Sequence, residues 1–174
     1  LDGGDCQVGI ESAIVDCSRD RAVLLRPGTL TRERIEAALG GEPLEAPDAA
    51  APRASGTLAA HYAPRAKVRM MNPAQLRAAL AVLGPQATGT SPPVAVYSRT
   101  AGPLPAGVPG RVMPADADAA AQALFATLRE LDATGAPLIW IEHPPAEPAW
   151  EGVRDRLQRA AAAGARHRHR PARA

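Results

Sequence analysis

The chain has 174 residues, a formal net charge of +2 and 22% charged side chains, so it is long enough to bury a core and is not dominated by charge of one sign. Apolar residues make up 46% of the sequence but aromatic residues only 3%, which predicts an aliphatic core of helices packed on a sheet. Two cysteines without zinc or disulfide spacing, no leader and no apolar run of about 18 residues favour a soluble protein of the cytoplasm with no membrane partner.

The first predicted element is a β-hairpin. Residues 8–16 alternate between apolar and polar or small side chains, and an apolar run resumes at residues 22–26 after a polar turn. A helix is expected over residues 31–39. Thr31 is the type of residue that caps a helix N-terminus, and Gly40 is the type that ends one.

Residues 43–66 lack an apolar period and contain several prolines, which indicates a linker. Loops of this length inside compact proteins are uncommon unless they have a function. The second half of the linker carries His61 and Tyr62, the one His–Tyr pair of the chain. We therefore expect this segment to do more than connect its neighbours.

The remainder of the chain alternates between strands and helices. Strands are predicted at residues 68–71, 94–98, 111–114 and 138–142, and helices at residues 74–83, 116–132 and 149–163. The segment at 138–142 is apolar except for Glu142, as expected of a central parallel strand that is buried on both faces. The alternation predicts a small doubly wound α/β domain with right-handed crossovers.

Motifs of known chemistry are scarce in this sequence. It has no glycine-rich phosphate loop and no cluster of metal ligands at a diagnostic spacing. The candidates for a site are therefore polar residues at the ends of elements or in the linker, where sites usually lie. They are Glu11, Ser12, Arg26, His61 and Tyr62.

Four motifs in order along the chain carry a resemblance to a known family. They are Gly-Ile-Glu-Ser-Ala-Ile-Val-Asp at 9–16, Arg-Pro-Gly at 26–28, His-Tyr-Ala-Pro at 61–64, and the helix sequences at 124–132 and 155–160. Together they resemble the C-terminal half of the YrdC-type L-threonylcarbamoyladenylate synthases in their long, two-domain form. The family's N-terminal catalytic half has no counterpart here, so we expect the chain to be a fragment, or to have a separate N-terminal partner, and to be inactive alone.

The resemblance implies a division of the chain into four parts. Residues 1–42 would be the C-terminal end of a YrdC-like α/β domain, and residues 43–66 a linker that closes over the site as a lid. Residues 67–164 would form a Rossmann-like three-layer α/β domain with a mostly parallel sheet. Residues 165–174 would be a basic tail, which its charge predicts to be disordered.

The family's reaction is the nucleotidyl transfer that converts threonine, bicarbonate and ATP into threonylcarbamoyl-AMP and pyrophosphate. Its product feeds the downstream threonylcarbamoyl transferase machinery that makes N6-threonylcarbamoyladenosine in tRNA. Mg²⁺ is expected to accompany ATP, although no metal ligand and no catalytic residue is assigned in this chain. The resemblance leaves open whether the chain contacts tRNA directly.

The resemblance also implies site roles, each of which has a structural alternative. Ser12 would bind threonine, or else satisfy a backbone group. Arg26, His61 and Tyr62 would bind ATP, or else Arg26 would be a solvated turn residue and the pair would pack within the loop. Glu11 is interpreted as structural, with its carboxylate bonded to backbone donors.

A second interpretation treats the chain as a stand-alone Rossmann-like binding or regulatory module without catalysis. Its ligand would then lie at the carboxyl ends of the strands, near Ser98 and Glu142 to His143. Four charged residues on the predicted helices are interpreted as a salt-bridged surface that fixes the helix ends: Arg129, Asp132, Asp155 and Arg156.

Overall fold

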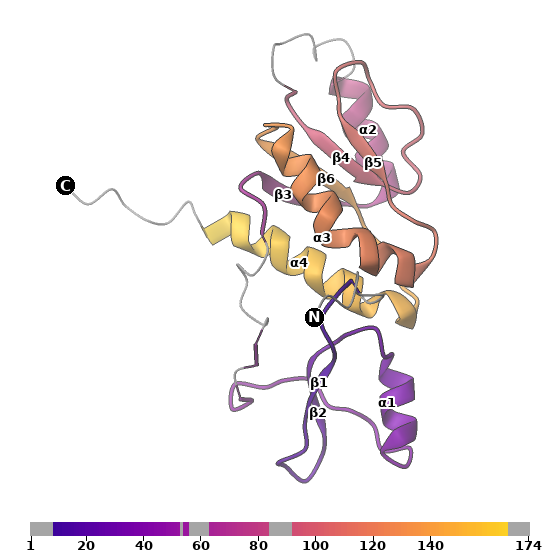
Figure 1. Ribbon diagram of the computed structural model, residues 1–174, viewed down its shortest axis with the longest axis vertical. Coiled ribbons are helices and arrows are strands. Elements are labelled where there is room, and N and C mark those ends of the chain that lie inside the picture. Colours follow the sequence, from indigo (N-terminus) through magenta and orange to yellow (C-terminus); the bar gives the residue numbers. More distant parts are fainter. Residues whose placement is uncertain (1–8, 53, 56–62, 84–91, 167–174) are drawn as a thin grey trace, which may run out of the picture.

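The structure is a computed structural model that describes residues 9–52, 54–55, 63–83 and 92–166. It consists of a small N-terminal part, with a two-stranded sheet and one helix, and a larger α/β part built on a four-stranded sheet (Figure 1). The predicted lid residues His61 and Tyr62 and most of the basic tail lie outside the described residues. Within the part that is described, no helix is both long enough and apolar enough to cross a membrane.

The N-terminal part confirms the predicted hairpin and helix. Strands β1 (Ile14–Asp16) and β2 (Val23–Arg26) pair antiparallel, with an irregular register between Ile14 and Val15. Helix α1 (Arg32–Ala38) follows, and the Thr31 hydroxyl accepts a hydrogen bond from the Arg34 backbone N–H, as an N-cap residue does.

The larger sheet confirms the predicted parallel arrangement. Its strand order is β3-β6-β4-β5, and every neighbouring pair is parallel. The strands are β3 (Lys67–Met71), β4 (Ala95–Ser98), β5 (Gly110–Val112) and β6 (Leu138–Glu142). The strand predicted to be central, β6, lies between β3 and β4, and β5 lies at an edge of the sheet.

Helices cover both faces of this sheet and give the three layers that were expected. Helix α2 (Pro73–Leu83) packs on one face, and α3 (Ala117–Ala133) and α4 (Glu151–Arg166) pack on the other. A short 3-10 helix, η2 (Pro148–Trp150), precedes α4. Helix α4 continues to Arg166, beyond residue 163, where its sequence pattern predicted the end.

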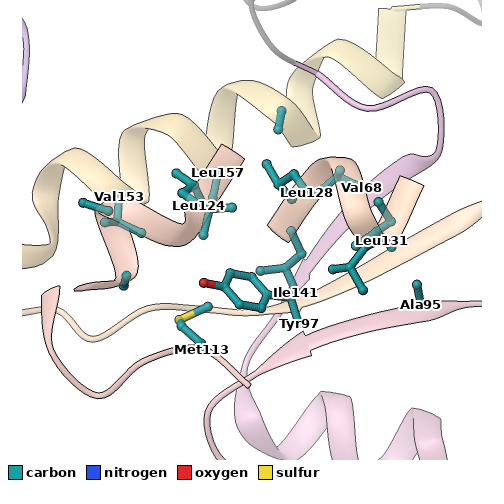
Figure 2. Packing of buried hydrophobic residues seen from close by; sticks show 14 of the residues in the cluster. Val68, Ala95, Tyr97, Met113, Leu124, Leu128, Leu131, Ile141, Val153 and Leu157 are labelled. Atoms are coloured by element: carbon teal, nitrogen blue, oxygen red, sulfur yellow. The ribbon is translucent and has the colours of Figure 1, made fainter. Parts of the chain in front are cut away.

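Side chains alternate between the two faces with the period of two that a strand imposes. On β6, Ile139 and Ile141 join the cluster under α3 and α4, whereas Leu138 and Trp140 pack against the cluster under α2. The first cluster, part of which is shown in Figure 2, is the larger of the two. It is mostly aliphatic, as the composition predicted.

The N-terminal segment is packed directly onto the larger domain. Ile10 is buried in the cluster beneath α3 and α4. A β-carbon at Gly9 would overlap the backbone of Gln122 on α3, and one at Gly152 on α4 would lie 2.6 Å from the carbonyl oxygen of Gly28. The absence of side chains at Gly9 and Gly152 therefore lets the N-terminal segment touch the α3 and α4 backbones.

Candidate functional site at the end of β2

Arg26 ends the inner strand of the hairpin and is buried, with 6% of its surface exposed. Its Nε donates to the Ser12 carbonyl oxygen at 3.1 Å, and its Nη1 donates to the Ser55 carbonyl oxygen at 2.6 Å. The prediction of a solvated turn residue is therefore wrong. All residues of β2 are buried, so the strand carries the Arg26 side chain inward, where its charge needs hydrogen-bond partners.

Ser12 lies beside Arg26, and its side chain is exposed. The backbone around it is tightly packed, because a β-carbon at Gly28 would lie 2.4 Å from the Ala13 nitrogen. Main-chain contacts thus fix this segment and leave the Ser12 hydroxyl at the surface. The structure brings the Arg26 side chain to the Ser12 backbone, while the roles of both residues in ligand binding stay predictions.

The linker reaches the same place. Ser55, which accepts the hydrogen bond from Arg26 Nη1, is the last described residue before the segment that contains His61 and Tyr62. After that segment the chain is anchored again, because the Ala66 backbone N–H donates to Asp132 Oδ1 on α3 at 2.8 Å. The linker is therefore attached at two points: Ser55 accepts a hydrogen bond from Arg26, and Ala66 donates one to Asp132 of α3.

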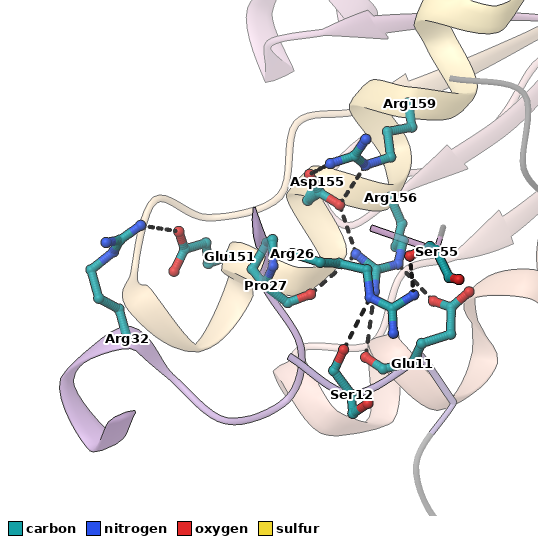
Figure 3. Close-up of polar contacts among 10 residues, drawn as sticks. All are labelled: Glu11, Ser12, Arg26, Pro27, Arg32, Ser55, Glu151, Asp155, Arg156 and Arg159. Atoms are coloured by element: carbon teal, nitrogen blue, oxygen red, sulfur yellow. Dashed lines mark hydrogen bonds and ion pairs between the residues drawn. The ribbon is translucent and has the colours of Figure 1, made fainter. Parts of the chain in front are cut away.

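A second arginine, Arg156 of α4, contacts the same N-terminal segment (Figure 3). Its Nε donates to Glu11 Oε2 at 2.9 Å and its Nη1 to the Pro27 carbonyl oxygen at 3.1 Å. Nη1 also donates to Asp155 Oδ2 at 2.6 Å, and Asp155 in turn binds Arg159. The interpretation of Arg156 as a surface residue is therefore wrong, since only 5% of its side chain is exposed.

The cluster sets the charge state of Glu11. Partial burial raises the pKa of Glu11, but its own backbone N–H, the Arg156 guanidinium and the charge of Arg26 together hold the pKa below the ordinary value. The carboxylate is therefore ionised at neutral pH and balances part of the positive charge of the two arginines. Glu11 was expected to be bonded to backbone donors; its side-chain partner in the structure is Arg156.

A signal for Arg156 was present in the sequence. The buried positions of α4 include Val153, Leu157 and Ala160, which recur at helical spacing, and Arg156 falls within that apolar stripe. A charged residue in a buried stripe requires an ion pair or hydrogen bonds from elsewhere in the fold. What the stripe could not reveal is that the partner would be Glu11.

The carboxyl ends of the larger sheet, which the second interpretation favoured, are closed by internal hydrogen bonds. Glu142 is 1% exposed, and its carboxylate accepts hydrogen bonds from the backbone N–H groups of Arg99 and Thr100 and from the Thr100 hydroxyl. Ser98 is buried, and His143 is exposed. The Glu142 carboxylate therefore ties β6 to the chain after β4 instead of facing an open crevice.

A polar cleft of about 330 Å³ separates the hairpin and α1 from α4. Arg32, Arg154 and Arg159 line it together with Glu151 and Asp155, and Arg32 reaches Glu151 at 3.3 Å. The described residues contain no group of three or more His, Cys, Asp or Glu side chains that could hold a metal ion. The arginines of this cleft are already paired within the chain: Arg154 donates to the Pro145 and Glu147 carbonyl oxygens, and Arg159 donates to Asp155.

Comparison with known sequences connects these residues to one family. The sequence profile described as "Threonylcarbamoyl-AMP synthase, C-terminal domain" matches residues 30–162. The threonylcarbamoyl-AMP synthase of Bacillus subtilis (strain 168) is 50% identical over 40 residues, which are 23% of this chain and 12% of that protein. The enzyme of the same name from Pyrococcus abyssi (strain GE5 / Orsay) is 38% identical over 74 residues, which are 39% of this chain and 21% of that protein.

Solved structures give the same result for the fold. P. abyssi Sua5 complexed with L-threonine superposes with a TM-score of 0.74 at 26% identity, over 94% of this chain and 49% of that one. A variant of P. abyssi Sua5, in which a histidine and the adjacent tyrosine are replaced by alanine, superposes with a TM-score of 0.71 at 26% identity, over 94% of this chain and 48% of that one. This chain thus spans about half the length of these structures and a smaller share of the curated relatives. Because the profile covers most of its length, the chain belongs to the family of threonylcarbamoyl-AMP synthase C-terminal domains.

Proposed function

We propose that this chain is the C-terminal portion of a threonylcarbamoyl-AMP synthase that converts threonine, bicarbonate and ATP into threonylcarbamoyl-AMP and pyrophosphate. The carbamate formed from threonine and bicarbonate attacks the α-phosphorus of ATP, and the bond to pyrophosphate breaks. The names of the relatives support this proposal, as does the likeness to P. abyssi Sua5 complexed with L-threonine. The product would pass to the threonylcarbamoyl transferase machinery for tRNA modification in the cytoplasm.

One observation carries the proposal for this chain. Arg26 joins the Ser12 segment to the linker through two hydrogen bonds, to the carbonyl oxygens of Ser12 and Ser55. Ser12 and Arg26, the residues expected to contact threonine and the nucleotide, therefore lie next to the point where the expected lid begins. We assign the exposed Ser12 hydroxyl to threonine.

Arg26 has two roles under this proposal. Nε and Nη1 hold the backbone of the described chain, so we assign the third guanidinium nitrogen, Nη2, to the nucleotide. A permanently charged, planar donor group suits the phosphate oxygens on which charge is redistributed during the transfer. We expect this contact to depend on the fork shape of the side chain as well as on its charge.

His61 and Tyr62 are proposed as the lid residues that exclude water and protect the carbamate. Support comes from the two anchors of the linker, Ser55 on Arg26 and Ala66 on Asp132, which place the ends of the lid segment on the N-terminal part and on α3. A relative with a histidine and adjacent tyrosine replaced by alanine has been solved, and His61-Tyr62 is the only such pair in this chain. Mg²⁺ is proposed to enter with ATP, and no residue of this chain is assigned to it.

The test is calorimetric titration of ATP, with Mg²⁺ and threonine present, into this chain and into a longer protein in which it follows its own upstream sequence. We expect binding to the longer protein only, and loss of binding in Arg26→Ala. Arg26→Lys should bind more weakly than the parent, because it keeps the charge without the fork. Arg21→Ala is the matched control, since Arg21 lies on the same hairpin and pairs only loosely with Glu45, at 3.5 Å.

Ser12→Ala tests the threonine contact separately. Its side chain is exposed, so the substitution should not disturb folding, while the affinity for threonine should fall. Equal binding of ATP to the isolated chain would overturn the proposal that the nucleotide site needs an upstream part, and undiminished binding in Arg26→Ala would overturn the assignment of Arg26. Unchanged threonine affinity in Ser12→Ala would overturn the assignment of Ser12.

A further inference from the structure

Arg156 is a charged residue in a buried position, and the fold has to compensate for it. Its side chain is 5% exposed, and it lies in α4 next to Leu157, which is fully buried. Burying a guanidinium is costly unless ion pairs and hydrogen bonds replace water. The groups that bind Arg156 must therefore stay in place for the domain to keep its packing.

Among the described residues, three of the four acceptors of Arg156 belong to the N-terminal segment. They are Glu11 Oε2 at 2.9 Å, the Glu11 carbonyl oxygen at 3.4 Å and the Pro27 carbonyl oxygen at 3.1 Å. The fourth acceptor is Asp155 Oδ2, on the same helix. Glu11 directly precedes Ser12 and Pro27 directly follows Arg26, so Arg156 binds next to both candidate ligand-binding residues.

Two guanidinium groups thus hold two consecutive carbonyl groups. Arg156 Nη2 binds the carbonyl oxygen of Glu11, and Arg26 Nε binds that of Ser12 at 3.1 Å (Figure 3). Fixing the peptide units on both sides of a residue fixes the direction of its Cα–Cβ bond. The direction in which the Ser12 side chain leaves the backbone is therefore set partly by α4.

Backbone contacts leave little room for this segment to move. A β-carbon at Gly152, in the first turn of α4, would lie 2.6 Å from both the Gly28 carbonyl oxygen and Ile10 Cδ1. A β-carbon at Gly28 would lie 2.8 Å from the Ser12 carbonyl carbon. Ser12, Gly28 and α4 form a continuous stack of backbone, so a displacement of α4 would be transmitted to Ser12.

We propose that Arg156 is a positioning residue through which the C-terminal domain orients Ser12 toward its ligand. The proposal rests on the proposed function only in taking threonine as that ligand. The attachment of the Glu11–Ser12 segment to α4 is independent of that function. The C-terminal domain then sets the affinity for the amino acid, which gives it a defined part in a site that it does not itself contain.

The attachment is tested by amide hydrogen exchange in this chain, compared between the parent and Arg156→Met. We expect exchange at residues 11–16 to accelerate about tenfold or more, since a hydrogen bond to a charged group is lost, while exchange in α3 stays unchanged. Arg156→Lys should give a smaller acceleration. Arg154→Met is the matched control, because Arg154 lies on the same helix but donates to the Pro145 and Glu147 carbonyl oxygens.

The positioning role is tested by steady-state kinetics in the longer protein. Arg156→Met should raise KM for threonine about tenfold or more while KM for ATP stays within about twofold of the parent value. Arg156→Lys should recover part of the loss, and Arg154→Met should change neither constant. A purely structural role would instead lower the amount of active enzyme and leave both KM values unchanged.

Three results would overturn the inference: unchanged exchange at residues 11–16 in Arg156→Met, equal increases of both KM values, or no change in either KM value. If Arg156→Met does not fold, Arg156→Lys and Glu11→Gln are read by the same criteria. A failure of the proposed function is recognised separately. In that case Ser12→Ala leaves KM for threonine unchanged, and the exchange experiment still decides whether α4 holds the segment.

Discussion

Arg156 Nε lies 2.9 Å from Glu11 Oε2, and this ion pair joins residues 145 positions apart in the sequence. It connects the last helix of the chain to the first described segment. Asp155 lies on the far side of the guanidinium and accepts a hydrogen bond from Nη1 at 2.6 Å. Two carboxylates therefore share one buried cation, and the removal of either should be measurable.

Glu11→Gln should lower stability at neutral pH but not in acid. The pKa of Glu11 is held below its ordinary value of 4.5 by its own backbone N–H and by Arg156 and Arg26, in excess of the burial that raises it. A lowered carboxyl pKa contributes stability above the unfolded-state pKa, and this stability disappears as the pH falls through the folded-state value. The difference in the free energy of unfolding between parent and variant should therefore be constant from about pH 7 to about pH 5 and become smaller at lower pH.

Urea unfolding of both proteins across this pH range measures the difference. Glu42→Gln is the control, since Glu42 is exposed and should give a small difference at every pH. A difference between parent and Glu11→Gln that persists unchanged into strong acid would mean that the carboxylate charge has no part in holding the segment.

Gly152→Ala should destabilise the protein, although alanine is the better helix former. Helix propensity alone would favour alanine by about 1 kcal/mol. The new β-carbon would lie 2.6 Å from the Gly28 carbonyl oxygen, which is backbone and cannot move away alone. We expect a net loss of about 1–3 kcal/mol, as for other overpacked sites.

Chemical denaturation measures this loss, and Ala162→Gly on the exposed side of α4 measures the propensity contribution in the same helix. Suppose that Gly152→Ala raises the free energy of unfolding by as much as Ala162→Gly lowers it. The helix would then have room for the added β-carbon, and α4 would not lie as close to the N-terminal segment as described.

Asp132→Ala should loosen the point where the linker enters β3. Burial raises the pKa of Asp132, but hydrogen bonds from the backbone N–H groups of Ala66 and Arg65 and from the Arg65 side chain outweigh this effect. The pKa is therefore below its ordinary value, and the carboxylate is ionised at neutral pH. Its removal leaves the Ala66 N–H without its 2.8 Å partner, at an expected cost of about 1–3 kcal/mol. Arg65→Ala is the control in the same denaturation experiment: the Arg65 side chain is 89% exposed, so its loss should cost at most about 1 kcal/mol. Equal effects of the two substitutions would assign the stabilisation to the ion pair.

Tyr97 should make the protein sensitive to alkali. The side chain is fully buried beneath α3, and burial raises its pKa to about 12 against a weaker opposing effect of Thr127. The unfolded chain ionises near the ordinary pKa of 10.0, so stability should fall as the pH rises above that value and toward the folded-state pKa. This contribution is at most about 3 kcal/mol.

Tyr97→Phe should remove this part of the pH dependence, because all other titrating groups remain in both proteins. The unfolding free energy of the parent should therefore fall relative to that of Tyr97→Phe as the pH rises from about 9 to about 11. Parallel curves would show that the Tyr97 hydroxyl is not held in its neutral form by burial.

The sequence by itself determined most of the fold and where to look for the site. The apolar run at 138–142 predicted a central strand buried on both faces, since a strand directs successive side chains to opposite faces. The motifs around Ser12 and Arg26 identified the segment that the structure brings together. Local patterns sufficed here because neighbouring residues interact within one element or one hairpin.

Only the tertiary structure decided which distant groups meet. Arg156 was misread as a surface residue, and its partner Glu11 could not be named, because no local period relates two residues on separate elements. The same holds for Arg26 and Ser55, which belong to a strand and a linker. The physical reason is that burial forces a charged group to find compensating charge and hydrogen bonds, but the packing of whole elements determines which residues supply them.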